Sequence, residues 1–226
     1  MSNSDKIILD LCGGTGSWSR PYKEAGYDVR TLTLPEFDVR GHSFMDGRLM
    51  ITHHGEEHSG VKEICQLKNV YGILAAPPCT MFSFARTNAK KPRDLKEGME
   101  CVRACLDIIW GCQEIQQPTS KKTLPLKFWA LENPSTGLLK HFLGRPAYYF
   151  NPWMFGDSYQ KSTVLWGYFN EPTKLTEKPI YHKKLVKFDY MKSKDIHPEA
   201  FGKFDRQTRR SITPAGFAQA FYEANK

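Results

Sequence analysis

One cysteine stands where a stiff loop would hold a reactive thiol. Cys79 follows two prolines in the segment APPCTMFS, residues 76–83, directly after an apolar run. Consecutive prolines restrict the backbone and keep the next residue out of a regular hydrogen-bond ladder. A thiol held in this way suits nucleophilic catalysis. A buried, inert cysteine explains the same residue by packing alone, so both interpretations stay open here.

An acidic residue also follows an apolar run. Glu132 lies in the segment LENP, residues 131–134, behind Phe128 and Trp129. Desolvation raises the pKa of a carboxyl group, which would keep Glu132 protonated near neutral pH. The alternative is a structural role, in which Glu132 caps the turn after Pro134.

A glycine-rich segment, residues 10–16, reads DLCGGTG between an apolar run and a helical pattern. Glycines at such a turn let the backbone approach a ligand and direct the N–H groups of a helix N-terminus toward it. The segment has neither the GK[ST] ending of a phosphate-binding loop nor the GxGxxG spacing of dinucleotide sites. It favours a nucleoside cofactor such as S-adenosylmethionine, the alternative being an ordinary strand-to-helix turn.

Strands and helices must alternate to position these segments. Apolar runs predict strands over residues 6–11, 27–34, 70–76, 127–132 and 163–169, whereas residues 41–69 look polar and irregular. Helices are expected from Ser17 to Gly26, with Ser17 or Ser19 as N-cap and Pro21 in the first turn, over 94–116, and after Thr213-Pro214. The order predicts an α/β fold with a mostly parallel central sheet, helices on both faces and ligand sites at strand ends.

Taken together, the three segments resemble the cytosine-C5 DNA methyltransferase family. The matching segments, in family order, are the glycine-rich turn, the catalytic loop Pro77-Pro78-Cys79 with Phe82-Ser83, and the acidic motif Glu132-Asn133. The resemblance covers most of the chain and implies a Rossmann-like, S-adenosylmethionine-dependent methyltransferase fold.

The resemblance also implies a covalent mechanism. The Cys79 thiolate attacks C6 of a cytosine while protonated Glu132 hydrogen-bonds N3, and C5 then takes a methyl group from S-adenosylmethionine. Elimination of the C5 proton and of Cys79 frees the enzyme. Because the target carbon is unreachable within duplex DNA, the cytosine has to be flipped out.

The chain departs from the family on the cofactor side. Cys12 stands where the family usually has a Phe that contacts adenine, and Trp18 is the nearby aromatic substitute. Thr33 replaces the acid expected at the ribose hydroxyls, leaving Glu36 or Asp38 to reach back. The cofactor residues implied by the resemblance are Leu11, Cys12, Gly13, Gly14, Thr15, Gly16, Ser17, Trp18, Thr33, Glu36, Asp38 and Pro77.

The substrate side departs as well. The family's Gln-x-Arg-x-Arg segment is reduced to Gln160-Lys161-Ser162-Thr163, where Lys161 lacks the planar fork of Arg. The closing Gly-Asn motif is replaced by Arg209-Arg210, shortly before Thr213-Pro214. The resemblance thus implies catalytic Cys79, Glu132 and Lys161, with substrate contacts from Pro78, Ser83, Asn133, Lys183, Lys184, Arg209 and Arg210.

Length and charge indicate one domain, residues 1–226, with DNA as partner. The net charge is +8, and residues 171–226 carry 12 basic against 7 acidic side chains. Only the short basic segment 171–210 takes the place of a target-recognition domain. It offers phosphate contacts but little surface for reading bases, which predicts low sequence specificity, similar to the compact methylases of phages.

The remaining features exclude several classes. No apolar stretch approaches a membrane span, and six cysteines without a CxxC pair predict free thiols in a reducing cytoplasm. Cys101, Cys105 and Cys112 fall near one helical face and are interpreted as core packing. The HHxxxH run at residues 53–58 is interpreted as a surface loop, so no metal is expected. We expect a monomer.

Two alternatives stay open. The same chemistry could act on RNA or on a free cytosine nucleotide, because so short a recognition segment does not require duplex DNA. The other is a catalytically silent, methyltransferase-like DNA-binding protein, in which the departures at Cys12 and Thr33 have removed turnover.

Overall fold

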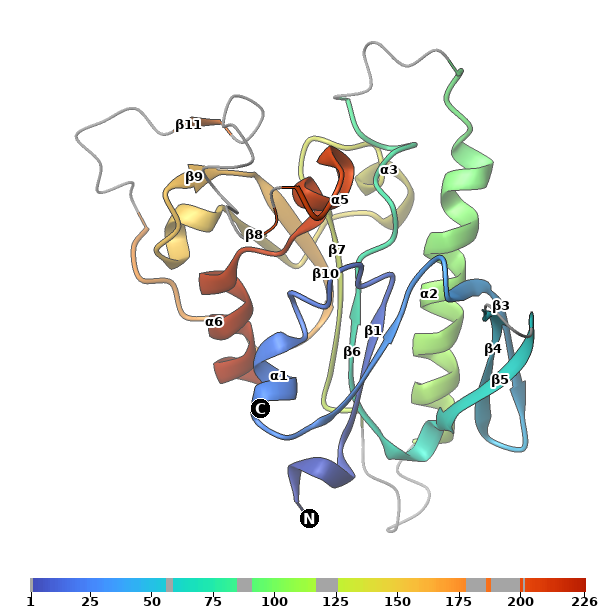
Figure 1. Ribbon diagram of the computed structural model, residues 1–226. Helices are drawn as coiled ribbons and strands as arrows, with labels where there is room; N and C mark the ends of the chain where they lie inside the picture. Colours follow the sequence, from blue (N-terminus) through green and yellow to red (C-terminus); the bar gives the residue numbers. More distant parts are fainter. Residues whose placement is uncertain are drawn as a thin grey trace.

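The computed structural model describes residues 2–55, 59–84, 91–116, 126–177, 186–187, 200 and 202–226. Its centre is a six-stranded sheet in the order β2-β1-β6-β7-β10-β8 (Figure 1). Its strands are β1 (Ile7–Leu11), β2 (Asp28–Leu32), β6 (Val70–Ala75), β7 (Phe128–Pro134), β8 (Tyr148–Phe150) and β10 (Thr163–Tyr168). Strands β2, β1, β6 and β7 are parallel, and β10 is antiparallel to both of its neighbours. The expected α/β class with a mostly parallel sheet is confirmed.

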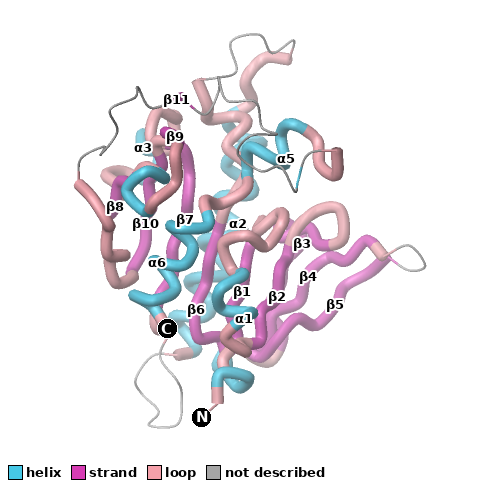
Figure 2. Tube along the Cα trace, turned by 60° about the vertical axis from the view of Figure 1, so that its left-hand side comes forward, coloured by secondary structure: helices cyan, strands magenta, loops and turns pink. Residues whose placement is uncertain are grey.

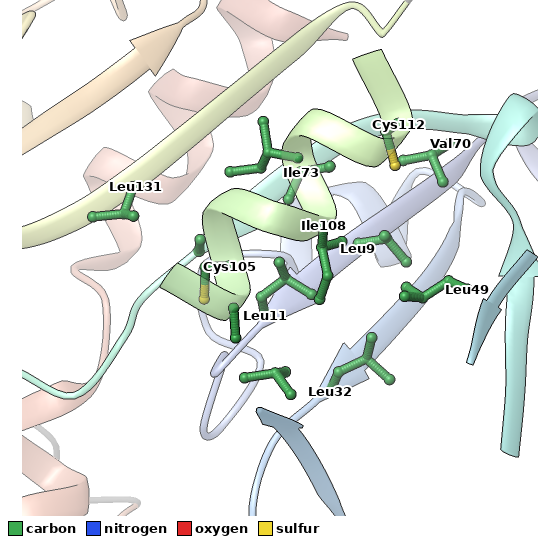
Figure 3. Packing of buried hydrophobic residues seen from close by; sticks show 14 of the residues in the cluster. Leu9, Leu11, Leu32, Leu49, Val70, Ile73, Cys105, Ile108, Cys112 and Leu131 are labelled. Carbon is green, nitrogen blue, oxygen red and sulfur yellow. The ribbon is translucent and has the colours of Figure 1, made fainter. Parts of the chain in front are cut away.

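Helices cover both faces of this sheet (Figure 2). Helix α2 (Leu95–Ile115) packs on one face, where Leu9 and Ile73 meet Ile108 in a single cluster (Figure 3). Helices α1 (Arg20–Glu24) and α6 (Ala215–Asn225) cover the other face, where alternate strand residues such as Ile8 pack with the aromatic rings of α6. Side chains alternate across a strand, so one apolar run supplies both layers.

Shorter elements lie outside the central sheet. They are helix α3 (Lys140–Leu143), helix α5 (Arg206–Ser211), and the parallel pair β9 (Tyr159–Gln160) and β11 (Val186–Lys187). Among the helices described, none is both long enough and apolar enough to cross a membrane.

The prediction that residues 41–69 are irregular is wrong. They belong to a three-stranded antiparallel sheet made of β3 (Phe37–Met45), β4 (Arg48–His54) and β5 (Ser59–Gln66). The strands pack against α2 through buried residues such as Leu49 and Ile51. Register shifts between Asp38 and His42, and between Leu49 and Met50, interrupt the alternation that would have revealed the strands.

The predicted helices were placed close to their observed bounds. Helix α1 begins at Arg20, so Ser17 lies before it and Ser19 occupies the N-cap position. Its side chain makes no capping hydrogen bond and instead donates to Asp10. Helix α2 begins after Asp94, whose carboxylate accepts the backbone N–H of Glu97 at 2.9 Å.

Candidate active site

Three loops meet at the carboxyl ends of β1, β6 and β7. The chain places β2 on one side of β1 and β6 on the other, and such a switch point opens a crevice at these strand ends. The backbone N–H of Ala76 donates to the Leu11 carbonyl at 2.9 Å, and Asn133 Nδ2 donates to the Pro77 carbonyl at 3.1 Å. The structure therefore joins the glycine-rich turn, the Pro-Pro-Cys loop and the Glu-Asn segment.

The glycine-rich turn is built over the carboxyl group of Asp10. A Cβ on Gly13 would lie 2.3 Å from Asp10 Cγ, so only glycine lets the chain pass there. Cys12 adopts the left-handed conformation with a φ of 57°, which is uncommon outside glycine. Its N–H donates to the Leu32 carbonyl on β2 at 2.8 Å, so the turn is tied to the neighbouring strand.

Asp10 itself was not among the predicted ligand residues. Burial raises the pKa of this carboxyl group to about 6, and the hydrogen bond from Ser19 partly opposes that rise. Its Oδ1 atom has no hydrogen-bond partner within the described part of the chain. Buried polar atoms are rarely left unsatisfied, so Oδ1 is an exception, and it is fully enclosed beneath the turn. The sequence signal that could have identified Asp10 is an acidic residue inside an apolar run, shortly before two glycines.

An open hollow of about 660 Å³ borders the turn, a volume within the usual range for small-molecule sites. It is lined by Gly14, Thr15, Gly16, Ser19, Arg20, Lys23, Glu24, Val29 and Thr31. Three predicted cofactor residues, Gly14, Thr15 and Gly16, are therefore among its walls. The sequence missed the contribution of α1 and of Thr31, because those residues carry no motif.

The residues predicted to bind ribose have other partners. The Thr33 carbonyl accepts the N–H of Phe37 at 2.9 Å. Glu36 lies 3.6 Å from His53 Nε2, and Asp38 pairs with Arg40 at 2.6 Å, which lowers the pKa of Asp38. Neither carboxylate lines the hollow.

Trp18 was predicted as an aromatic contact for the cofactor, and its position argues against that role. The side chain is 2% exposed and lies in the core, with ring centroids 5.4 Å from Phe221 and 6.0 Å from Phe217. It therefore packs under α6 rather than facing an open ligand site. The adjacent Ser17 accepts the backbone N–H of Thr213 at 2.8 Å, so the C-terminal segment closes over the turn.

The Pro-Pro-Cys loop is held as a defined turn. The backbone N–H groups of Phe82 and Ser83 both donate to the Cys79 carbonyl, at 2.9 and 2.8 Å. The guanidinium group of Arg93, just before α2, donates to the carbonyls of Met81 and Ser83. No sequence motif marks this Arg93 contact. Cys79 is half-buried.

Glu132 and Asn133 lie on β7, which continues to Pro134 instead of ending before Asn133. Burial raises the pKa of the Glu132 carboxyl group, and the nearby Lys161 cation partly opposes the rise. Asn133 is 1% exposed and connects β7 to the Pro77 carbonyl. The predicted desolvated acid is therefore present.

The thiol of Cys79 interacts electrostatically with three charged or titratable groups, those of Glu132, Lys161 and Arg210. Burial, followed by the negative charge of Glu132, raises the pKa of the Cys79 thiol, whereas Lys161 and Arg210 oppose the rise. Charge effects of this kind require neighbouring groups. Arg209 donates to the Phe204 carbonyl, and the predicted substrate residues Lys183 and Lys184 lie outside the described residues.

No family model matches the chain, and no curated protein matches it either.

Proposed function

We propose that this chain is a DNA cytosine-C5 methyltransferase with a Rossmann-like fold and low sequence specificity. The observation that carries the proposal is the electrostatic interaction between the Cys79 thiol and the desolvated carboxyl group of Glu132. The two groups lie at the ends of adjacent parallel strands. Two cations, Lys161 and Arg210, act on the same thiol.

The two groups support each other's chemistry. Cys79 would form a bond from sulfur to C6 of the cytosine, while Glu132 holds a proton toward N3. Loss of the thiol proton to water breaks S–H, while Glu132, protonated beforehand, keeps the O–H that it directs toward N3. Because Glu132 is then neutral, its charge no longer destabilises the Cys79 thiolate. The cations of Lys161 and Arg210 stabilise that thiolate.

The residues around the turn fit a nucleoside cofactor. The hollow beside Gly14, Thr15 and Gly16 is the feature that supports this fit. Pro77, buried between the two loops, would separate cofactor from base. S-adenosylmethionine, when bound, supplies the methyl group that C5 receives.

DNA contacts would come from the basic C-terminal part of the chain. Helix α5 carries Arg209 and Arg210 in its last turn, and Ser211 Oγ lies 3.8 Å from the Cβ position of Gly14. With the net charge of +8, these cations favour phosphate binding near the crevice. A flipped cytosine would then enter between α5 and the Pro-Pro-Cys loop.

A transfer assay tests the proposal. Purified protein with labelled S-adenosylmethionine and duplex DNA should yield 5-methylcytosine, and a duplex containing 5-fluorocytosine should trap a covalent adduct at Cys79. Parallel reactions with RNA and with a cytosine nucleotide identify the acceptor. Full activity in Cys79→Ala would overturn the covalent mechanism.

A specific observation favours a second candidate, a methyltransferase-like DNA-binding protein without turnover. Trp18 is packed in the core, and Glu36 and Asp38 have partners of their own. Calorimetry with S-adenosylmethionine distinguishes the two candidates. Salt-sensitive DNA binding without heat from the cofactor would favour the silent protein.

A further inference from the structure

Three thiols converge beneath the glycine-rich turn, and the proposed methyl transfer uses none of them. The Sγ atoms of Cys12, Cys101 and Cys105 all lie within 4.8 Å of one another, and those of Cys12 and Cys101 are 3.3 Å apart. Cys101 and Cys105 are one turn apart on α2, and Cys12 contacts them from the glycine-rich turn after β1. The core packing predicted for Cys101 therefore accounts for only part of its surroundings.

The spacing suits metal coordination better than packing alone. A metal–sulfur bond of about 2.3 Å places thiolates about 3.8–4.0 Å apart in tetrahedral or trigonal geometry. The observed sulfur positions need only small shifts to reach that spacing. All three are free thiols in the structure, because even the 3.3 Å between Cys12 and Cys101 exceeds the about 2.05 Å length of a disulfide bond.

The surroundings also suit a thiolate cluster. Cys105 is fully buried, whereas Cys12 and Cys101 are half-buried, so one side of the cluster is open to a water ligand. Arg40 acts on Cys101 as a nearby cation, which offsets part of the negative charge that three thiolates would bring. No His or carboxylate oxygen joins the cluster among the residues that the structure describes.

We propose that Cys12, Cys101 and Cys105 form a three-thiolate site for a thiophilic d10 metal ion, Zn²⁺ or Cu⁺. Sulfur donors select these ions over hard cations. Binding exchanges three S–H bonds for three metal–sulfur bonds and releases up to three protons. It ties the glycine-rich turn to α2. The site does not depend on the proposed methyl transfer.

Metal titration of the reduced full-length chain tests the site. Zn²⁺ is titrated against a chromophoric chelator and Cu⁺, under anaerobic conditions, against a Cu⁺-selective chelator, both in a Cys79→Ser background. We expect one ion per chain. Losing even an outer-sphere partner typically weakens metal binding 10–100-fold, so Cys105→Ala should weaken it at least about 100-fold.

The matched control is Cys112→Ala. Cys112 is fully buried on the same helix but lies beside Val70, away from the cluster (Figure 3). This variant should bind the ion within about twofold of the parent. Equal losses in Cys105→Ala and Cys112→Ala would overturn the assignment, because the effect would then follow helix integrity.

A second measurement needs no variant. Alkylation of the native chain, mapped by mass spectrometry, should show that Zn²⁺ or Cu⁺ protects Cys12, Cys101 and Cys105 and leaves the reactivity of Cys79 unchanged. Failure of the reduced chain to bind either ion would overturn the proposal. So would protection confined to other cysteines, or a Cys12–Cys101 disulfide forming while the ion is present.

Discussion

The loops after β1 and β6 begin at neighbouring strand ends, yet different forces hold them. The Pro-Pro-Cys loop is fixed by distant residues, since Asn133 and Arg93 donate to its carbonyls. The glycine-rich turn rests on its own strand, over the Asp10 carboxyl group, and is closed by Thr213. The loop that carries the proposed nucleophile is thus held by residues of other segments, and the turn proposed to bind the cofactor is shaped around one buried acid.

Removing the thiol of the braced loop should have the largest effect. Cys79→Ala should lower methyl transfer by at least about 10⁴-fold, because no other group there can form the bond to C6. Transfer kinetics with labelled cofactor measure the loss. DNA affinity should stay the same, and an equal fall in DNA affinity would indicate a structural effect instead.

The acid beside that thiol should come next. Glu132→Ala should lower the rate about 10²–10⁴-fold, the usual contribution of a positioned proton donor. Glu132→Gln keeps a donor for N3 and should retain more activity than Ala while losing the rate decrease at high pH that deprotonation of Glu132 causes. Identical rates and pH profiles in the two variants would contradict the proton-holding role.

The turn has a pH signature of its own. The pKa of Asp10 is about 6 in the folded chain against an ordinary 3.8, so the folded state binds the proton more tightly. Stability should fall as pH rises from about 4 to 6, by at most about 3 kcal/mol from this group.

Denaturant unfolding at several pH values checks this prediction. Asp10→Asn should flatten the part of the curve that Asp10 causes. Asp157, whose pKa is also raised to about 6 by burial, contributes in the same direction, and Asp157→Asn is the matched comparison. If Asp10→Asn left the pH dependence of the free energy of unfolding unchanged, Asp10 would not be the group that causes it.

Removing the hydrogen bond from Asn133 to the Pro-Pro-Cys loop should have the smallest effect. Asn133→Ala leaves the Pro77 carbonyl without its side-chain donor, which should cost about 1–3 kcal/mol in urea unfolding. Asn170→Ala is the control, because its side chain donates to the Ala224 carbonyl at an exposed position. Asn170→Ala should lower the free energy of unfolding by less. Equal decreases in the two variants would show that the buried Asn133 hydrogen bond stabilises the fold no more than an exposed one.

Much of this arrangement was accessible from sequence because local patterns specify it. The apolar runs placed β1, β6, β7 and β10 closely, and Asp94 marked the start of α2. The motif order also placed Cys79 and Glu132 at strand ends that prove to be adjacent. Whether they catalyse methyl transfer stays a prediction.

The rest depends on contacts that no local pattern carries. Register shifts hid β3, β4 and β5, and only the packing of α6 determines that Trp18 points into the core. The convergence of Cys12 with Cys101 arises between segments 89 residues apart. Arg93 likewise acts through the backbone of another loop, where residue type gives no signal.

The hydrogen bond from Thr213 to Ser17 joins positions 196 residues apart, and Tyr22 donates to the Asn225 carbonyl at 3.5 Å. During synthesis on the ribosome, the turn after β1 emerges well before these partners are made. The ligand-facing turn is thus completed only after residues 213–225 have left the exit tunnel. A nascent chain would therefore contain the Pro-Pro-Cys loop and β7 before the turn after β1 is closed.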